Sequence, residues 1–288
     1  MVIFIGMKII QKLVRGYLRC RFRVVSAVAP RKAAAEALRL FCTPMTRNRR
    51  PAPEVFLSGI PVSMDVGGIR VNGYQWKSEH GPQAMILHGF ESSCWNFGDY
   101  ISALLEKGDG VIAFDAPGHG ISEGDSITLP LYITMIQQAE AEFGQATLFV
   151  AHSFGGIALV HHLEDRNGAA GTRSALIAPV TESASAIDSF FNYFKLNSTV
   201  RVHFDELIEA NSGYSSRHFS IPRAIPQLQG CVLWVHDKYD EITPFKDVRP
   251  VIEQNYPHVE MLITEGLGHK KIYRDPVVVK KVIDFLST

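Results

Sequence analysis

The chain has 288 residues, of which 46% are hydrophobic and 20% charged, and its basic and acidic residues cancel to a formal net charge of zero. This length is enough for a sizeable hydrophobic core, and α/β folds of this size often form one domain. The four cysteines are widely spaced and include no C-x-x-C pair, so neither a zinc site nor a disulfide framework is indicated. We expect reduced thiols in a cytoplasmic setting.

The neutral total conceals a strongly basic N-terminal segment. Residues 1–50 contain twelve Lys and Arg but a single acidic residue, Glu36. Many of the basic residues recur at spacings of three and four, which aligns them on one face of a helix, while apolar residues fall on another side. The basic set is Lys8, Lys12, Arg15, Arg19 and Arg23, and the apolar set is Ile9, Leu13, Tyr17, Cys20 and Val24. We therefore predict a basic amphipathic arm over residues 1–50, with a second helix over 31–41 and a linker over 47–53.

Three placements of this arm are compatible with the sequence. It lies on an anionic membrane surface through residues 8–23, it docks on its own domain or on a partner, or it is disordered. Nucleic acid is not an expected partner, because no aromatic interleaving or binding motif accompanies the basic residues. Neither a secretory signal nor a membrane span is expected, since Lys8 and Lys12 interrupt the apolar start and Pro30 follows the small residues 27–29. The expected location is cytoplasmic, with peripheral membrane contact as an alternative.

Beyond the linker, strand and helix patterns alternate. This alternation predicts an α/β fold with a mostly parallel sheet and helices on both faces. Ligands of such sheets bind beyond the carboxyl ends of the strands, so the residues that follow each strand are the candidates for a functional site. The expected strands lie near 55–64 and 69–76, up to 87, up to 114, over 148–150 and over 175–178, and the expected helices lie near 100–107, near 131–143 and up to 165.

Two of these strands lead into glycine-containing loops. The strand up to residue 87 runs into His88-Gly89-Phe90, and the strand up to residue 114 runs into Asp115-Ala-Pro-Gly-His-Gly120. We interpret the second loop as turn chemistry. His88 and His119 are expected to organise the loops through hydrogen bonds rather than to carry protons, because chemistry at one nucleophile needs only one base.

Ser153 follows the largely apolar run Leu148-Phe-Val-Ala-His152, and a sequence typical of a helix begins directly after it. A serine hydroxyl is a weak nucleophile at neutral pH, so catalysis needs it exposed on a sharp turn with a base beside it. Small residues flank the turn, with Ala151 two positions before the serine and Gly155 two positions after it. The pattern is that of a nucleophile elbow, G-x-S-x-G, with alanine in place of the first glycine.

Two later segments supply an acid and a base. A buried-strand pattern over 230–240 ends in Asp240, so an acid is expected just past a strand. A strand pattern over 259–265 is followed by a glycine-rich loop that presents His269. Asp240 is the preferred acid for the histidine. Three other carboxylates remain alternatives because they lie nearby or follow another strand: Asp237, Glu241 and Glu182.

The alternation breaks between residues 181 and 226, an interval too long for an ordinary connection. We predict a small helical cap inserted after the strand over 175–178. Its aromatic residues either form an apolar wall for an acyl chain or pack the cap onto the sheet. They are Phe190, Phe191, Tyr193, Phe194, Phe204, Tyr214 and Phe219.

In this chain order, the motifs resemble the α/β-hydrolase fold family over roughly residues 55–288. The resemblance implies a hydrolase domain over 51–288, with Ser153 as nucleophile, Asp240 as orienting acid and His269 as general base. It also implies an oxyanion hole made by the backbone N–H groups of Phe90 and Phe154.

The activity implied by the resemblance is hydrolysis of a small-molecule carboxylic ester with a small or medium apolar acyl group, through an acyl-enzyme and without cofactor or metal. Thioester and peptide cleavage and acyl transfer remain alternatives on the same triad. A non-catalytic scaffold recruited to membrane by its basic arm is a further alternative.

Overall fold

The protein is described from a computed structural model. The described residues are 2–47, 51–79, 81, 83–166 and 169–288, without the side chains of residues 2–12. Residues 48–50 of the predicted linker over 47–53 and the side chains of Lys8, Ile9 and Lys12 lie outside the described residues. The chain divides into two compact units, which we name the helical unit, Met1–Cys42 with Ser183–Phe219, and the sheet unit, Thr43–Glu182 with Ser220–Thr288.

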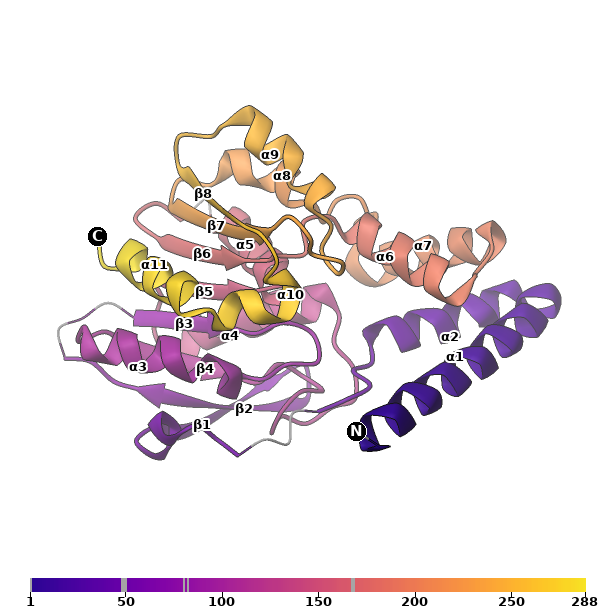
Figure 1. Cartoon of the computed structure of the whole chain (residues 1–288), viewed down its shortest axis with the longest axis horizontal. Coiled ribbons are helices and arrows are strands. Elements are labelled where there is room, and N and C mark those ends of the chain that lie inside the picture. Colours follow the sequence, from indigo (N-terminus) through magenta and orange to yellow (C-terminus); the bar gives the residue numbers. More distant parts are fainter. Residues whose placement is uncertain (1, 48–50, 80, 82, 167–168) are drawn as a thin grey trace. The chain divides into compact units, whose positions relative to one another are not determined.

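The sheet unit is built on one eight-stranded sheet with the strand order β1-β2-β4-β3-β5-β6-β7-β8 (Figure 1). β1 and β2 pair antiparallel, as do β2 and β4, and all other neighbours are parallel. The predicted α/β fold with a mostly parallel sheet is confirmed. The strands are β1 Ile60–Val66, β2 Ile69–Trp76, β3 Gln83–Leu87, β4 Gly110–Phe114, β5 Leu148–His152, β6 Arg173–Ile177, β7 Cys231–Asp237 and β8 Val259–Thr264.

Helices cover both faces of this sheet, with α3 and α11 in front and α4 and α5 behind in Figure 1. The predicted helices near 100–107, near 131–143 and up to 165 correspond to α3, α4 and α5. The α-helices of the sheet unit are α3 Gly98–Glu106, α4 Leu129–Phe143, α5 Phe154–Asp165, α8 Ile221–Ala224, α9 Arg249–Gln254, α10 Gly268–Lys271 and α11 Pro276–Leu286. Short 3-10 turns lie at η1 Glu54–Leu57, η2 Cys94–Phe97, η3 Ile225–Gln227, η4 Phe245–Asp247 and η5 Ile272–Arg274.

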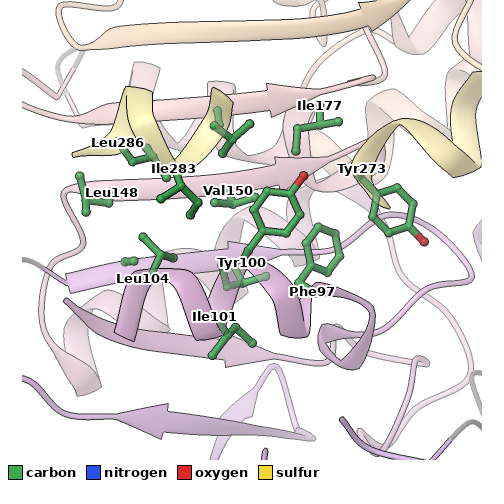
Figure 2. Packing of buried hydrophobic residues seen from close by; sticks show 14 of the residues in the cluster. Phe97, Tyr100, Ile101, Leu104, Leu148, Val150, Ile177, Tyr273, Ile283 and Leu286 are labelled. Carbon is green, nitrogen blue, oxygen red and sulfur yellow. The ribbon is translucent and has the colours of Figure 1, made fainter. Parts of the chain in front are cut away.

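One hydrophobic core lies between the sheet and the helices α3 and α11. Tyr100, Ile101 and Leu104 recur at helical spacing on α3, and all three are buried. Figure 2 shows them beside Val150 of β5 and the α11 residue Ile283. These side chains tie the first and last helices of the sheet unit to the central strands, which fixes the strand ends from which the functional residues extend.

The strand predicted near 55–64 begins later than expected. Glu54–Leu57 forms the turn η1, and β1 starts at Ile60. Phe56 is buried against Trp76, with ring centroids 5.3 Å apart. An extended strand from residue 55 would carry this ring along the sheet edge, whereas the turn folds it onto the aromatic cluster.

The helical unit contains two helices from the predicted arm and two from the predicted cap. Its helices are α1 Val2–Val28, α2 Pro30–Cys42, α6 Ser183–Phe194 and α7 Ser198–Ser212. Ala33, Ala34 and Ala37 of α2 are fully buried, and such small side chains let helix backbones approach closely. Phe22 of α1 and Phe204 of α7 complete the same core. The arm and the cap therefore form one hydrophobic core, although 140 residues of sequence separate their segments.

This packing shows what three phenylalanines of the predicted cap contact. Phe41 of α2 lies edge-on to Phe190 and Phe204, with ring centroids 5.2 and 5.9 Å apart. Phe191 and Phe204 are buried in the core of the helical unit. The interpretation of the cap aromatics as a wall for an acyl chain is wrong for these two residues, because their surface is already covered by the arm.

Among the helices in the described part of the chain, none combines the length and the apolar character that crossing a membrane requires.

We predict that Gly155→Ala destabilises the sheet unit by about 1–3 kcal/mol, because an added Cβ overpacks a tight helix-strand contact. That Cβ would lie 2.6 Å from the backbone oxygen of Leu87 and 2.7 Å from that of His88. Urea denaturation followed by circular dichroism measures the change.

The matched control is Gly16→Ala in α1, where an added Cβ meets nothing within 4 Å. This change should stabilise the protein by about 0.5–1 kcal/mol through helix propensity. Equal stability of Gly155→Ala and the wild type would contradict the close contact between α5 and the end of β3.

Candidate active site

The candidate residues lie after the carboxyl ends of the parallel strands, as expected for this kind of sheet. Ser153 follows β5, Asp240 lies three residues after β7, and His269 lies in α10 after β8. The histidine was expected in an open glycine-rich loop, and the structure places it in the short helix Gly268–Lys271 instead. The parallel order brings the three strand ends to one edge, where the side chains meet.

Ser153 occupies a sharp turn between β5 and α5. Its backbone has φ +54° and ψ −117°, a conformation that is costly for any residue with a Cβ. The turn is held from the next strand, because the N–H of Ser153 donates to the Ile177 carbonyl at 3.1 Å. The Ser153 carbonyl in turn accepts from Val180 N–H at 3.0 Å. These hydrogen bonds hold the serine at the carboxyl end of the strand in a strained conformation.

Glycines next to the turn leave no room for side chains. A Cβ on Gly89 would lie 2.8 Å from the Cβ of Ser153, and a Cβ on Gly156 would lie 2.7 Å from the Cβ of Pro179. Ala151, which replaces the usual first glycine of the elbow, is fully buried in β5. The extra methyl group is therefore accommodated inside the sheet.

The serine, histidine and aspartate form a continuous hydrogen-bonded chain. The Nε2 atom of His269 lies 3.0 Å from the Oγ of Ser153, and its Nδ1 lies 2.8 Å from Oδ2 of Asp240. The three side chains are almost completely shielded from solvent, since only 8% of the His269 side chain is exposed. With Nδ1–H donating to the aspartate, Nε2 is free to accept the serine proton.

Asp240 is surrounded by hydrogen-bond donors. Although burial alone favours the neutral acid, hydrogen bonds from His269 and Thr243 lower the pKa of Asp240 to about 2. The Thr243 hydroxyl donates to Oδ2 at 2.8 Å, and the backbone N–H groups of Ile242 and Thr243 donate to Oδ1. The carboxylate is therefore charged at neutral pH and fixed in orientation.

Thr243 contacts both Asp240 and His269, and the sequence reasoning missed it. Its carbonyl accepts a hydrogen bond from Nε2 of the buried His236 at 2.9 Å, and Nδ1 of His236 accepts from Trp234. The available signal was the spacing Asp-x-x-Thr, in which an aspartate accepts hydrogen bonds from the backbone that follows it.

The other candidate acids have different partners. Asp237 accepts from Tyr239 N–H, Thr264 Oγ1–H and Leu267 N–H, so it joins the ends of β7 and β8. Glu182 accepts from the Ser220 hydroxyl at 2.8 Å, and Glu241 is exposed. Asp240 is the carboxylate that the structure brings to His269.

Phe90 and Phe154, whose backbone N–H groups are the predicted oxyanion hole, each follow a residue at the turn, Gly89 and Ser153. Phe154 is the first residue of α5, so its N–H has no carbonyl one turn earlier within the helix. Phe90 directly follows Gly89, which packs against Ser153. The two phenyl rings meet edge-to-face with centroids 6.2 Å apart. The two N–H groups remain the predicted oxyanion hole.

Buried histidines hold the loops in this region. His88 contacts the Gly89 carbonyl through Nδ1 at 2.7 Å and accepts from Ala116 N–H through Nε2 at 2.9 Å. His119 accepts from Glu91 N–H through Nε2 at 3.0 Å. Burial lowers the pKa of His88 to about 4 and that of His119 to about 3. Both imidazoles are neutral at physiological pH and serve as the loop organisers that the sequence predicted.

His152, which precedes Ser153, contacts the backbone of His269. Its Nε2 lies 3.2 Å from the His269 carbonyl, and its ring lies 4.4 Å from that of Tyr273. Burial lowers the pKa of His152 well below its usual value. A neutral imidazole with Nε2–H donating to that carbonyl fixes the backbone of α10.

Within the residues that the structure describes, no group of three or more His, Cys, Asp or Glu side chains is arranged to hold a metal ion.

Residues 84–259 match the alpha/beta hydrolase family. The chain belongs to this family. The match spans β3 to the start of β8 and includes the Ser153 turn and Asp240. No curated protein matches the sequence.

Solved structures extend the likeness over most of the chain. An esterase of Pyrococcus furiosus has a TM-score of 0.63 at 17% identity, with 85% of this chain and 95% of that chain covered. Mouse alpha/beta hydrolase domain-containing protein 10 has a TM-score of 0.59 at 16% identity, with 78% and 96% covered. A monoacylglycerol lipase of Paleococcus ferrophilus has a TM-score of 0.56 at 19% identity, with 75% and 98% covered. At these identities the likeness concerns the fold.

We predict that acid destabilises the protein partly through His88. In the unfolded chain this imidazole binds a proton below about pH 6.5, whereas the folded chain resists protonation down to about pH 4. Stability therefore falls as the pH drops through this window, by about 2 kcal/mol between pH 7 and pH 5 for this residue alone.

Urea unfolding at pH 7 and pH 5 measures this loss in the wild type and in His88→Gln. The variant should be less stable at pH 7 but should lose less stability between the two pH values. If both proteins lose the same amount, His88 is not a buried neutral group.

Proposed function

We propose that the protein is a serine hydrolase that cleaves a carboxylic ester through an acyl-enzyme intermediate. The observation that carries the proposal is the chain of contacts from Ser153 Oγ to His269 Nε2 at 3.0 Å and from His269 Nδ1 to Asp240 at 2.8 Å. Ser153 lies on a strained strand-to-helix turn, which is where this fold places an activated serine.

In the first step, Ser153 Oγ attacks the ester carbonyl carbon while His269 Nε2 takes the hydroxyl proton. Asp240 holds the imidazole and stabilises its positive charge. The carbonyl oxygen becomes an oxyanion, which the backbone N–H groups of Phe90 and Phe154 stabilise. The carbon–oxygen bond to the alcohol then breaks, and His269 returns the proton to the departing alkoxide.

In the second step, water replaces the alcohol. His269 removes a proton from the water as its oxygen attacks the acyl carbon, and the second oxyanion forms in the same place. Collapse of this intermediate releases the carboxylic acid, and the proton passes from His269 back to Ser153.

The choice of an ester is supported by the family and by the esterase and the lipase among its structural neighbours. An apolar acyl group of small or medium size and a cytoplasmic setting remain part of the proposal. Thioester, peptide and acyl-transfer chemistry on the same residues are the alternatives, so the assays must include thioesters.

We predict that Ser153→Ala lowers ester turnover by about a million-fold while leaving the fold intact. Alanine is as compatible as serine with the backbone of this turn, so thermal unfolding should stay close to that of the wild type. The measurements are hydrolysis of a chain-length series of chromogenic esters and thioesters, and covalent labelling by a fluorophosphonate probe.

The matched control is Ser174→Ala, which removes another buried serine hydroxyl from β6 of the same sheet. It should keep the label, whereas Ser153→Ala should lose it. Retention of more than a few per cent of activity in Ser153→Ala, or absence of labelling in the wild type, would contradict the proposal.

We predict that Thr243→Val lowers kcat/KM about tenfold, because a hydrogen bond to a charged carboxylate contributes about 1.5–3 kcal/mol. Valine has nearly the same shape but cannot donate to Asp240 Oδ2. Steady-state kinetics at pH 7 on a chromogenic ester measure the effect. Thr243→Ser keeps a hydroxyl at this place and should restore most of the activity, while equal loss in both variants would indicate a packing effect.

A further inference from the structure

The first helix has two apolar faces, and its own unit uses only one of them. Phe22 is buried in the core of the helical unit, where Leu18 and Val25 pack beside it. These residues recur at spacings of four and three, so they line one side of α1.

The second apolar face points to solvent. Leu13 is 68% exposed, Tyr17 64%, Val24 61% and Val28 82%. With the exposed Cys20 they follow the spacings 4, 3, 4 and 4, which places them in one stripe along the helix. We call this set the outer stripe. It contains the apolar set that the sequence singled out, apart from Ile9, whose side chain is not described.

Basic residues surround the outer stripe. Arg21 and Arg23 lie one or two positions from its members, and Arg31 and Lys32 follow its end at the start of α2. All four are exposed, and Glu36 is the acidic partner of Arg21 at 2.9 Å. The helical unit as a whole has twelve Lys and Arg against five Asp and Glu.

Two basic residues of α1 make contacts inside the helical unit instead of facing a partner. Arg19 donates to the backbone carbonyl of Tyr193 at 2.8 Å, and the guanidinium of Arg15 lies 5.3 Å from the centre of the Tyr193 ring. These two arginines join α1 to α6 within the helical unit. The surface of α1 that is available to a partner is therefore the outer stripe with the basic residues beside it. The sequence instead singled out the basic face that includes Arg15 and Arg19.

We propose that the outer stripe binds a membrane surface containing anionic lipids, with α1 lying in the plane of the headgroups. An amphipathic helix with a basic border and exposed aliphatic and aromatic side chains fits such an interface. The apolar side chains enter the boundary between headgroups and acyl chains, and the arginines meet lipid phosphates. The outer stripe spans the 16 residues from Leu13 to Val28, which gives a contact about 24 Å long.

Charge favours lipid over a second copy of the chain. Two helical units that meet through this face would bring together two surfaces with a surplus of seven positive charges each. An anionic bilayer neutralises that surplus instead. The proposal concerns only the helical unit and does not depend on the catalytic assignment.

Vesicle sedimentation of the full chain tests the proposal. Vesicles of phosphatidylcholine with about one third phosphatidylserine should bind the protein, and pure phosphatidylcholine vesicles should bind it much more weakly. Raising the salt from about 0.1 to 0.5 M should weaken binding, because the screening length shortens. Val24→Glu should weaken binding to the anionic vesicles at least about tenfold. It removes an apolar side chain that enters the membrane in this proposal and adds a negative charge, the sign of the lipid headgroups.

Val202→Glu is the matched control. Val202 lies on α7 and is 57% exposed, close to the 61% of Val24, so both variants change the same residue type and the same net charge. This control should bind as the wild type does. Both variants should keep wild-type hydrolysis of a soluble ester and wild-type thermal unfolding.

Equal loss of vesicle binding in both variants would overturn the stripe as the binding face, and equal binding to neutral and anionic vesicles would overturn the role of charge. Wild-type vesicle binding by Val24→Glu would also overturn the proposal. A dimer of the wild type in size-exclusion chromatography that Val24→Glu dissolves, together with no vesicle binding, would assign the stripe to a second copy.

Discussion

The strained backbone at Ser153 is the constraint on which the arrangement of the site depends. A residue with a Cβ at φ +54° costs about 1–3 kcal/mol, and the cost is offset by the structure around it. Hydrogen bonds to Ile177 and Val180 hold the turn from the side of β6, and Gly89 and Gly155 allow the end of β3 to approach it. The serine is thus fixed by the sheet itself, and its hydroxyl is presented where the neighbouring strands end.

Three aspartates at or just after strand ends make different contacts. Asp115 accepts from the N–H groups of Cys94 and Ile121, and Asp237 accepts from those of Tyr239 and Leu267, so each ties one loop to another. Asp240 accepts from its own loop on one oxygen and keeps the other for Thr243 and His269. The imidazole of His269 extends the contacts of Asp240 into a hydrogen-bonded chain that ends at Ser153. His88 and His119 stay neutral and structural because burial disfavours their charged forms.

The sheet and the contact of Ser153, His269 and Asp240 could be predicted because their signals are local. Apolar runs that end in polar residues mark the parallel strands, and a serine between Ala151 and Gly155 marks the turn. The contribution of Thr243 could not be ranked from sequence, since its value comes from a hydroxyl that meets a carboxylate only after the loop folds. The start of β1 was misplaced because Val55 and Phe56 have strand propensity, yet Phe56 is needed against Trp76.

The pairing of the arm with the cap could not be predicted for a different reason. Periodicity shows that α1 has apolar faces but not which face meets which segment, and the partners α6 and α7 lie far along the chain. Packing assigns Phe22 to the inside and Val24 to the outside, although both are apolar and only two residues apart.

Phe191 and Phe204 pack in the same core as residues of α1 and α2, so removing the arm would expose them. The helical unit would then unfold, and any binding face on it would be lost as well. Loss of a property on truncation would not distinguish a lost binding face from a lost core. Single substitutions of outward side chains separate the two, because they change the surface of α1 and leave the packing of Phe22 intact.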